Sequence, residues 1–328
     1  MSSHNRFALT VMNMAKRGFG DKYQGAEVHG FADNDSPWLV PINPDYIFDN
    51  TDAMRMMHQV WGREWERPDS RHRKGIYFSG PTGSGKTSFV EQFFARLNVP
   101  LLRATWNPKR EAEDMVSTQT LVDGDLMPRD QAIAIAARQG LPVLINEVDL
   151  ADPGELMALA DVVEKGLITL PNGQSFTAER GFVVFCSANT AGTDDEAGIH
   201  HGTRSQNVAF LRRFFHVHMG YPELEAEVEY LQTAFPKAEQ TFLECAAKVA
   251  VKIRQAFEGT ADKERLSSPI SRPELLDWVD MMFRFEGLKS KGKNVAEFAM
   301  DMCFARRLNE ADRITVFSIV ENCFGDAA

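Results

Sequence analysis

Short apolar runs alternate with a stretch of helical periodicity in the middle of the chain. The runs at 76–78, 143–145 and 182–187 are mostly apolar, which is typical of strands buried on both faces of a sheet. Apolar residues recur at helical spacing over 87–97. Strands that alternate with helices in this way predict an α/β fold with a parallel sheet covered on both faces.

The same region predicts two further helices and a hairpin. One helix is expected to begin with Asp130 as its N-cap and to end at Gly140. A second helix should cover 153–165, because it starts with proline, which is favoured at the first helical position. Residues 167–177 predict a β-hairpin whose tight turn is the Asn172-Gly173 pair.

The two ends of the chain differ from its middle. Residues 1–44 are rich in Gly, Asn, Asp and Pro and have weak periodicity, so we expect an arm or a loosely packed extension. After Tyr221-Pro222 only helical stretches remain. They cover residues 223–235, 242–257, 273–285 and 296–324, the last with a break. The predicted domains are therefore an extension at 1–44, an α/β domain at 45–220 and a helical domain at 221–328.

The clearest chemical signal is the segment GPTGSGKT, which fits the pattern GxxxxGK[ST] between a predicted strand and a predicted helix. Its residues are Gly80, Pro81, Thr82, Gly83, Ser84, Gly85, Lys86 and Thr87. In such a loop, backbone N–H groups and a helix N-terminus face phosphate, Lys86 reaches the β and γ phosphates, and Thr87 offers its hydroxyl to Mg²⁺. The segment predicts ATP and Mg²⁺ binding.

The run Val143–Ile145 is followed by two polar residues, Asn146 and Glu147. P-loop ATPases place a metal-side Asp and a water-activating Glu at the end of such a strand. The amide oxygen of Asn146 can still accept a hydrogen bond from a Mg²⁺-bound water but brings no charge, whereas Glu147 is the candidate base. The alternative is that both residues only end a structural strand.

The strand at 182–187 leads to Asn189. If this strand lies between the other two, Asn189 could position the attacking water near the γ-phosphate. The alternative is an ordinary turn asparagine that faces solvent.

These segments resemble AAA+ ATPases of the MoxR branch, and most closely the small ATPase subunit of aerobic cobaltochelatase. The resemblance runs from about Pro41 into the helical C-terminal part. It rests on PINPDYIFD (41–49), GPTGSGKTSFVEQ (80–92), INEVDLADP (145–153), ADVVEKGLITL (160–170), SANTAGTDDEAGIHHGT (187–203) and FLRRF (210–214). The P-loop is common to many NTPases, whereas DYIFD and the ANT…GIHHGT run are more particular to this branch.

The resemblance implies a P-loop AAA+ three-layer αβα domain followed by a helical lid, assembled into a hexameric ring with ATP between neighbours. It also implies an arginine finger that each neighbour supplies. Arg213 falls at the family's position for this arginine, but Arg212 stands where an acidic residue is usual, so both remain candidates. Arg272 is the candidate sensor 2 arginine; it could equally cap a surface helix. Without the resemblance, an Arg-Arg pair is more often a solvated helix end than a catalytic group.

Composition excludes several classes of protein. The 328 residues are 25% charged and 44% hydrophobic, which fits a globular protein and excludes a disulfide miniprotein, a collagen and a disordered tail. The net charge of −10 offers no broad surface for nucleic acid or anionic membrane. The four cysteines are scattered, and no leader or membrane-spanning run is evident, so we expect reduced thiols, no zinc site and a cytoplasmic protein.

Two features favour an ordinary structural interpretation. Adjacent histidines such as His200-His201 rarely converge on one metal ion, and no third ligand is suggested by spacing. The basic run 63–74, with its two tryptophans, could touch single-stranded nucleic acid, but acidic residues interrupt it and favour a solvated connector.

Three hypotheses of function follow. The leading one is a ring motor whose ATP hydrolysis remodels a partner protein; the resemblance implies a partner with a von Willebrand A domain, contacted through the hairpin at 171–174. Its specific form is a cobaltochelatase subunit that works with a large tetrapyrrole-binding subunit. The alternatives are a nucleic-acid-associated ATPase of replication or recombination and a nucleotide-gated binding module with slow hydrolysis.

Overall fold

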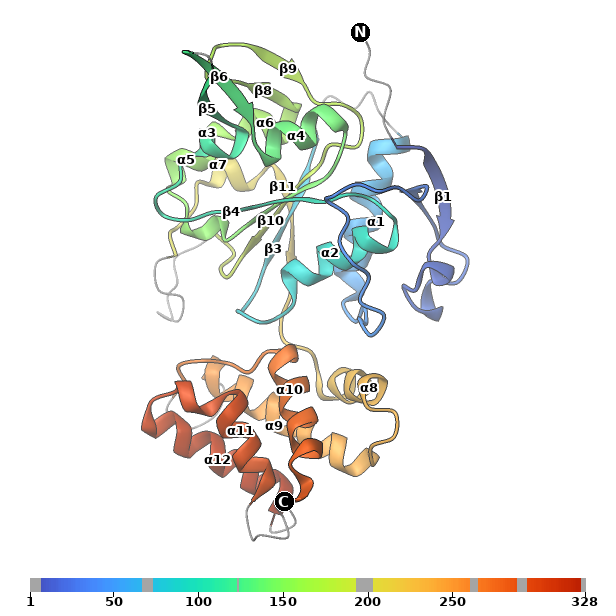
Figure 1. Cartoon of the computed structure of the whole chain (residues 1–328), viewed down its shortest axis with the longest axis vertical. Helices are drawn as coiled ribbons and strands as arrows, with labels where there is room; N and C mark the ends of the chain where they lie inside the picture. The colour runs from blue at the N-terminus through green and yellow to red at the C-terminus, as the bar shows by residue number, and fades with distance from the viewer. Residues whose placement is uncertain are drawn as a thin grey trace. The chain divides into compact units, whose positions relative to one another are not determined.

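Five parallel strands form the central sheet, in the order β11-β3-β10-β7-β4 (Figure 1). In chain order they are β3 (Gly75–Ser79), β4 (Leu102–Thr105), β7 (Val143–Asn146), β10 (Val184–Ala188) and β11 (Phe214–His218). Every residue of β3 and β10 is buried, as their apolar sequences predict. The computed structural model describes residues 7–66, 73–122, 124–192, 203–259, 265–287 and 294–325.

Helices lie against this sheet, so the predicted αβα architecture is confirmed (Figure 1). The helices of this part are α1 (Thr51–Glu66), α2 (Lys86–Arg96), α3 (Ala112–Val116), α4 (Ala132–Gln139), α5 (Pro153–Ala158), α6 (Ala160–Lys165), α7 (Val208–Leu211) and the 3-10 helix η3 (Val148–Leu150). The predicted helix at 153–165 is divided at Leu159, whose N–H bonds to the carbonyl of Leu156 and tightens the turn.

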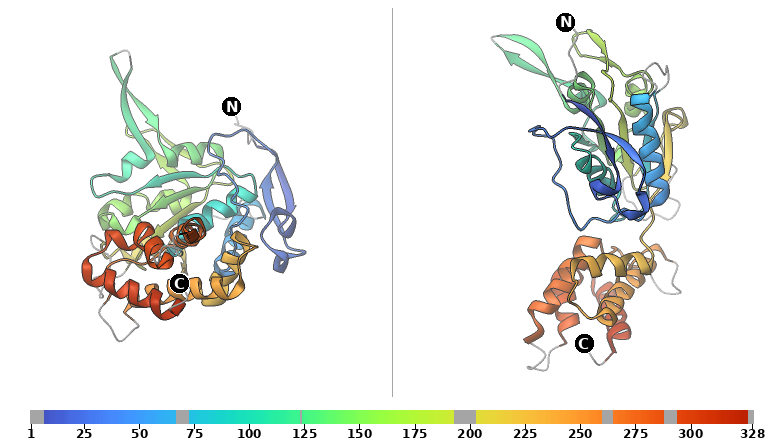
Figure 2. Two further views of the ribbon diagram at one scale, coloured as in Figure 1. Left: turned by 60° about the horizontal axis from the view of Figure 1, so that its bottom comes forward. Right: turned by 90° about the vertical axis from the view of Figure 1, so that its right-hand side faces the viewer.

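Three antiparallel hairpins accompany the parallel sheet. β8 (Leu167–Thr169) and β9 (Ser175–Thr177) form the predicted one. The sequence did not predict β5 (Ser117–Val122) and β6 (Asp125–Asp130), which extend away from the sheet in Figure 2. The expected helix start at Asp130 was wrong, because Asp130 pairs with Ser117 as the last residue of β6 and Gln131 is the N-cap of α4.

The described part of the N-terminal stretch is packed, in contrast to the expected loose arm. The third hairpin consists of β1 (Leu9–Asn13) and β2 (Glu27–Phe31). The ring of Phe31 is fully buried against Trp61 and Trp65 of α1, and the indole of Trp61 donates to the carbonyl of His29 over 2.6 Å. The 3-10 helices η1 (Ala15–Arg17) and η2 (Asp21–Tyr23) connect the two strands.

Arg96 at the end of α2 holds the same stretch through its guanidinium. Its Nε donates to the carbonyl of Gly18 over 2.8 Å, and its Nη2 donates to the carbonyls of Asn43 and Tyr46. The Nε of Arg17 donates back to the Arg96 carbonyl over 2.6 Å. A buried guanidinium must satisfy its donors, and here backbone carbonyls of the N-terminal stretch do so.

Among the described residues after Met219, the regular elements are all helices. The elements are α8 (Leu224–Ala234), α9 (Gln240–Glu258), α10 (Arg272–Arg284), α11 (Val295–Cys303), the 3-10 helix η5 (Ala305–Arg307) and α12 (Glu310–Phe324). Ser271 and Glu274 form a capping box that starts α10. Among the described helices, none is long and apolar enough to cross a membrane.

The chain folds as two compact units. The first, the α/β unit, contains Met1–Gly80 and Lys86–Met219, and the second, the helical unit, contains Pro81–Gly85 and Gly220–Ala328. The N-terminal stretch therefore falls within the α/β unit.

We predict that Phe31→Ala lowers the free energy of unfolding by about 3 kcal/mol, because it removes a fully buried ring between β2 and α1. Denaturant unfolding of the full chain measures this loss. The matched control is Val11→Ala on the neighbouring strand, where the side chain is 55% exposed and the loss should stay below about 0.5 kcal/mol. Equal effects of the two substitutions would mean that the hairpin contributes little to the core.

Candidate functional site

Three adjacent strands of the sheet end next to the residues that the sequence singled out. β3 leads into the loop before Lys86, β7 ends at Asn146, and β10 ends one residue before Asn189. Since the carboxyl ends of parallel strands share one edge, and ligands of open α/β sheets bind outside that edge, the order β3-β10-β7 brings these residues together.

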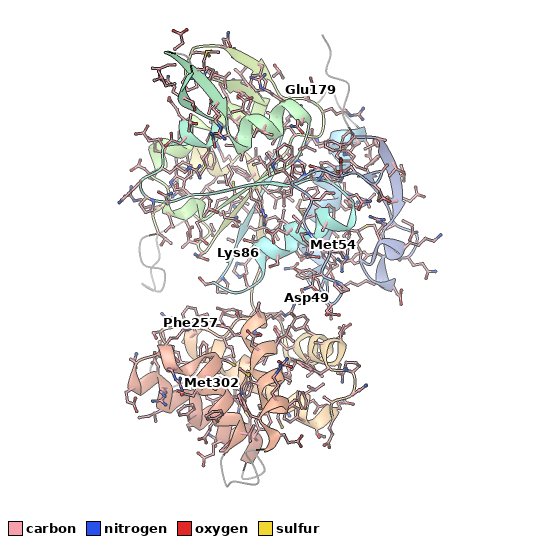
Figure 3. The ribbon with its side chains drawn as sticks, viewed as in Figure 1. Asp49, Met54, Lys86, Glu179, Phe257 and Met302 are labelled. Carbon is pink, nitrogen blue, oxygen red and sulfur yellow. The ribbon has the colours of Figure 1, made fainter. Side chains whose placement is uncertain are left out.

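Lys86, labelled in Figure 3, is the first residue of α2. Its side chain is buried, with only 8% of the residue exposed. Its Nζ donates to the carbonyl of Gly80 over 2.7 Å and to Oδ1 of Asn189 over 3.2 Å. Burial lowers the pKa of the Lys86 ammonium to about 8, although the nearby carboxylates of Glu147 and Asp149 act in the opposite direction. The site thus holds a cation that is largely removed from water.

Gly80 must be a glycine. Its φ is +148°, and a Cβ at this position would lie 2.0 Å from the carbonyl oxygen of Met219. This close approach fixes the start of the loop and aims the Gly80 carbonyl at Lys86. Gly83 and Gly85 also have positive φ, of 81° and 88°, as a loop whose N–H groups turn toward one ligand requires.

Asn146 lies between two hydroxyl groups. Its Oδ1 accepts from Oγ1 of Thr87 over 3.0 Å and from Oγ of Ser187 over 2.9 Å. Mg²⁺ prefers oxygen ligands and keeps several waters, so Thr87 directly and Asn146 through water fit a magnesium ion that is also bound to phosphate. The oxygens of this set are neutral. Ser187 was not singled out from the sequence, where it only ends an apolar run.

Glu147 follows with φ 59° and ψ 38°, a left-handed conformation that is uncommon outside glycine. Its Oε2 accepts from Nδ2 of Asn189 over 3.2 Å. Burial raises the pKa of Glu147, and so does the neighbouring carboxylate of Asp149, while Lys86 lowers it. A carboxylate with raised proton affinity is suited to act as a general base.

Asn189 connects the two charged groups. Its Oδ1 accepts from Lys86 and its Nδ2 donates to Glu147, so a single amide spans the cation and the candidate base. This amide orientation satisfies both contacts. The ordinary interpretation, a solvent-facing turn asparagine, does not fit these contacts.

Sequence reasoning missed Asp149, two residues after Glu147. Its side chain is completely buried, and its Oδ2 accepts from the backbone N–H groups of Asn189, over 2.7 Å, and Thr190, over 3.2 Å. The only available signal was a second acidic residue shortly after the strand, in the run NEVD.

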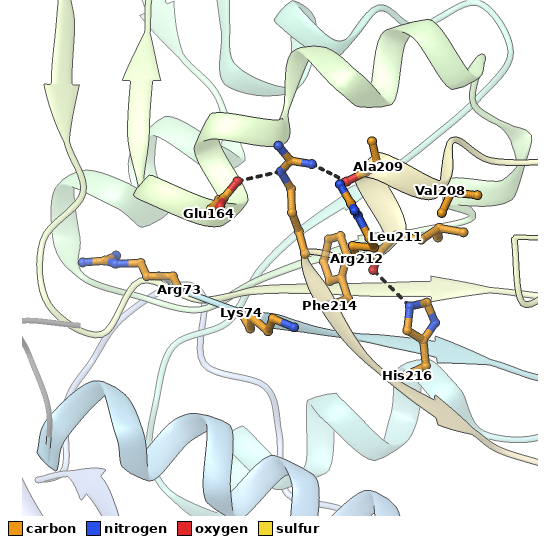
Figure 4. A pocket seen from close by; sticks show the side chains of 10 residues that line it. Arg73, Lys74, Glu164, Val208, Ala209, Leu211, Arg212, Phe214 and His216 are labelled. Carbon is orange, nitrogen blue, oxygen red and sulfur yellow. Dashed lines mark hydrogen bonds and ion pairs between the residues drawn. The ribbon is translucent and has the colours of Figure 1, made fainter. Parts of the chain in front are cut away.

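The arginine pair lies away from this cluster, in a pocket of the α/β unit of about 800 Å³ (Figure 4). Nε of Arg213 forms an ion pair with Oε2 of Glu164 at 3.0 Å, and its Nη1 donates to the carbonyl of Ala209. Arg212 lines the same pocket and is exposed. None of the residues that line this pocket belongs to the cluster around Lys86.

Arg272 belongs to the helical unit, where it begins α10. Its Nε lies 3.1 Å from Oε1 of the completely buried Glu227, and its guanidinium stacks 4.8 Å from the ring centre of Tyr230. The same Glu227 oxygen pairs with Arg254 at 2.7 Å. Arg272 is thus held by a buried carboxylate, which a simple surface cap would not need.

Several expectations concern residues outside the described ones. His200 and His201 lie there, and so do residues 67–72 of the basic run at 63–74. Within the described ranges, no group of three His, Cys, Asp or Glu side chains could hold a metal ion. The four cysteines are free thiols.

Comparison with known proteins identifies the core of the chain. Residues 75–214 match the family model "AAA domain (dynein-related subfamily)". This region belongs to that AAA family. The match begins with β3 and ends at the first residue of β11, so the AAA domain contains the whole cluster around Lys86 and the arginine pair. The predicted resemblance to MoxR-type AAA+ ATPases is confirmed.

Relatives extend the likeness beyond the AAA domain. Aerobic cobaltochelatase subunit CobS of Sinorhizobium sp is 24% identical over 300 residues, which are 88% of this chain and 83% of the relative. Protein NorQ of Paracoccus denitrificans is 28% identical over 157 residues, 47% of this chain and 55% of the relative. An uncharacterised protein of Staphylococcus haemolyticus is 24% identical over 216 residues, 64% and 79% of the two chains.

We predict that a non-hydrolysable ATP analogue takes up a proton when it binds at high pH. Without nucleotide, burial lowers the pKa of the Lys86 ammonium from its ordinary value of 10.5 to about 8, so most of this lysine is neutral well above pH 8. The phosphates of the analogue should raise this pKa and restore the positive charge. Proton uptake should therefore be clearly larger at about pH 8.5 than at about pH 7. Calorimetry in buffers of different ionisation enthalpy measures it. Equal uptake at both pH values would contradict the assignment.

Proposed function

We propose that this chain is an ATP-hydrolysing AAA+ ring motor that remodels or activates a partner protein. Membership of the AAA family supports ATPase activity. The observation that carries the proposal is the amide of Asn189, which joins Lys86 to Glu147 beside the Thr87–Asn146 pair. A cation for phosphate, a candidate base and a group that can orient water are thereby assembled at one edge of the sheet.

Each residue has a role in this proposal. The loop Gly80–Thr87 holds the phosphates, and Lys86 places its charge on the β and γ groups. Glu147 accepts a proton from a water molecule while the oxygen of that water attacks the γ-phosphorus. The bond between the γ-phosphorus and the bridging oxygen of the β-phosphate breaks, which releases ADP and phosphate. Asn189 orients that water. Magnesium, held by Thr87 and through water by Asn146, would supply positive charge to the phosphates.

We further infer that the chain works as a homo-hexamer with ATP at the contacts between subunits. In such a ring, Arg213 or Arg212 of one subunit would approach the γ-phosphate held by its neighbour, and Arg272 would serve as sensor 2. The ion pairs of Arg213 and Arg272 support these roles, because a guanidinium that binds a carboxylate can also bind a phosphate. The free thiols favour a cytoplasmic location.

The relatives suggest the kind of partner. One of them is a subunit of an aerobic cobaltochelatase, and the specific form of our proposal is a chelatase subunit that works with a von Willebrand A-domain protein and a large tetrapyrrole-binding subunit. The β8–β9 hairpin is the candidate contact. Arg138 of α4 stacks 3.8 Å from the ring centre of Phe176 in β9 and pairs with Asp130 of β6 at 2.6 Å, so one side chain of α4 contacts both hairpins.

We predict that Glu147→Gln captures the partner from cell extract in the presence of ATP, because the variant should bind ATP without hydrolysing it. Affinity purification with mass spectrometry identifies what is retained. A von Willebrand A-domain protein with a tetrapyrrole-binding subunit supports a chelatase, and other companions support a different client. The controls are Lys86→Ala, which should retain nothing, and deletion of residues 171–174, which should lose the partner but keep ATP binding. Nucleic acid or recombination proteins alone would favour the nucleic-acid ATPase instead.

The neutral Asn146 favours a second candidate, a nucleotide-gated module that hydrolyses ATP slowly. We predict that Asn146→Asp lowers the Mg²⁺ concentration for half-maximal hydrolysis by about tenfold, because a carboxylate adds a charge-assisted contact. Steady-state hydrolysis at varied Mg²⁺ measures it, with Ser187→Ala as the control that removes a contact to Asn146 but adds no charge. A large rise in kcat at saturating Mg²⁺ would favour the slow module, and an unchanged, fast kcat favours the motor.

A further inference from the structure

Asp149 is a buried carboxylate that the mechanism above does not use. Its side chain is completely buried within the α/β unit, whereas Glu147, two residues earlier, is partly exposed. Its Oδ1 has no hydrogen-bond partner among the described residues. Burying a carboxylate with an unsatisfied oxygen is unfavourable for stability, and the presence of an acidic side chain here therefore calls for another reason.

The other oxygen, Oδ2, binds two consecutive backbone N–H groups. The bond from Asn189 is 2.7 Å long and the bond from Thr190 is 3.2 Å long. Hydrogen bonds to an ionised acceptor are short and strong compared with neutral ones. The carboxylate thus fixes the backbone at the point where the chain leaves β10.

The same short turn carries Glu147. Asp149 is the middle residue of η3, and the N–H of Leu150 bonds back to the carbonyl of Glu147 over 3.1 Å. Because Glu147 and Asp149 belong to one closed turn, the position of the candidate base is tied to the position of the Asn189 backbone. This geometry sets the 3.2 Å contact between the Asn189 amide and the Glu147 carboxylate.

We propose that Asp149 is a positioning residue for ATP hydrolysis, which acts through Asn189 by holding its amide between Lys86 and Glu147. The inference rests on the proposed ATPase function. It predicts a loss of kcat and little change in nucleotide affinity, because the P-loop contacts of the phosphates do not involve Asp149.

A double-mutant cycle on the full chain tests this. Asp149→Leu and Asn189→Ala should each lower kcat roughly 10- to 100-fold, as the loss of residues that orient a catalytic group does. The dissociation constant of a non-hydrolysable ATP analogue should change less than about threefold. In the double variant kcat should equal that of the more impaired single variant. Once the Asn189 amide is gone, the loss of Asp149 can no longer displace it and should have no further effect on kcat.

If Asp149→Leu does not fold, the same cycle is run with Asp149→Asn. This variant keeps an oxygen acceptor but loses its charge, so kcat should fall about fivefold in the wild-type background and not at all in the Asn189→Ala background.

The matched control is Asp152→Ala, three residues further along. Asp152 is an exposed cap of α5 whose Oδ1 accepts from the N–H of Gly154, so its loss should lower Tm without lowering kcat. Two results would overturn the positioning role. One is that the kcat losses of the single variants multiply in the double variant. The other is that Asp152→Ala lowers kcat as much as Asp149→Leu does. The wild-type chain tests the proposed function separately. If it hydrolyses no ATP, the proposed function fails; if it hydrolyses ATP but the variants give either result above, only the role of Asp149 fails.

Discussion

The partly desolvated charge of Lys86 is the constraint on which the site depends. A lysine that is only 8% exposed is stable only if fixed dipoles replace the lost water, and the carbonyl of Gly80 and the amide of Asn189 do this. Burial still lowers the pKa of its ammonium to about 8. Because the positive charge is incompletely compensated, an anion such as phosphate would stabilise the charged form of Lys86.

The sheet order supplies what Lys86 needs. Asn189 and Gly80 are more than a hundred residues apart in the chain, yet they flank the same ammonium because β10 lies directly beside β3. β7 lies on the other side of β10 and brings Asn146 and Glu147 to the same edge. A substitution that shifts β10 along its neighbours would therefore disturb the contacts of Lys86, Asn146 and Glu147 together.

The sequence was sufficient wherever a side chain acts through its own motif. The loop from Gly80 to Thr87 and the pair Asn146-Glu147 could be recognised because strand, turn and helix signals surround them. Asp149 could not, because its partners are two backbone N–H groups forty residues later that no side-chain pattern reveals. The N-terminal hairpin was missed for a related reason, since Phe31 is buried by Trp61 of a distant helix and not by any local periodicity. Asp130 has the residue type of an N-cap, but strand pairing with Ser117 outweighs that local preference.

Two arginines outside the Lys86 cluster are also partly buried cations that need partners, but their partners are carboxylates. Arg213 and Arg272 each face a carboxylate, from Glu164 and Glu227. In both pairs a guanidinium binds a planar anion, and the same fork of N–H donors is suited to phosphate. Lys86, in contrast, is held in place by the backbone of its own loop. The chain therefore combines one lysine that backbone and amide oxygens hold with arginines that carboxylates hold.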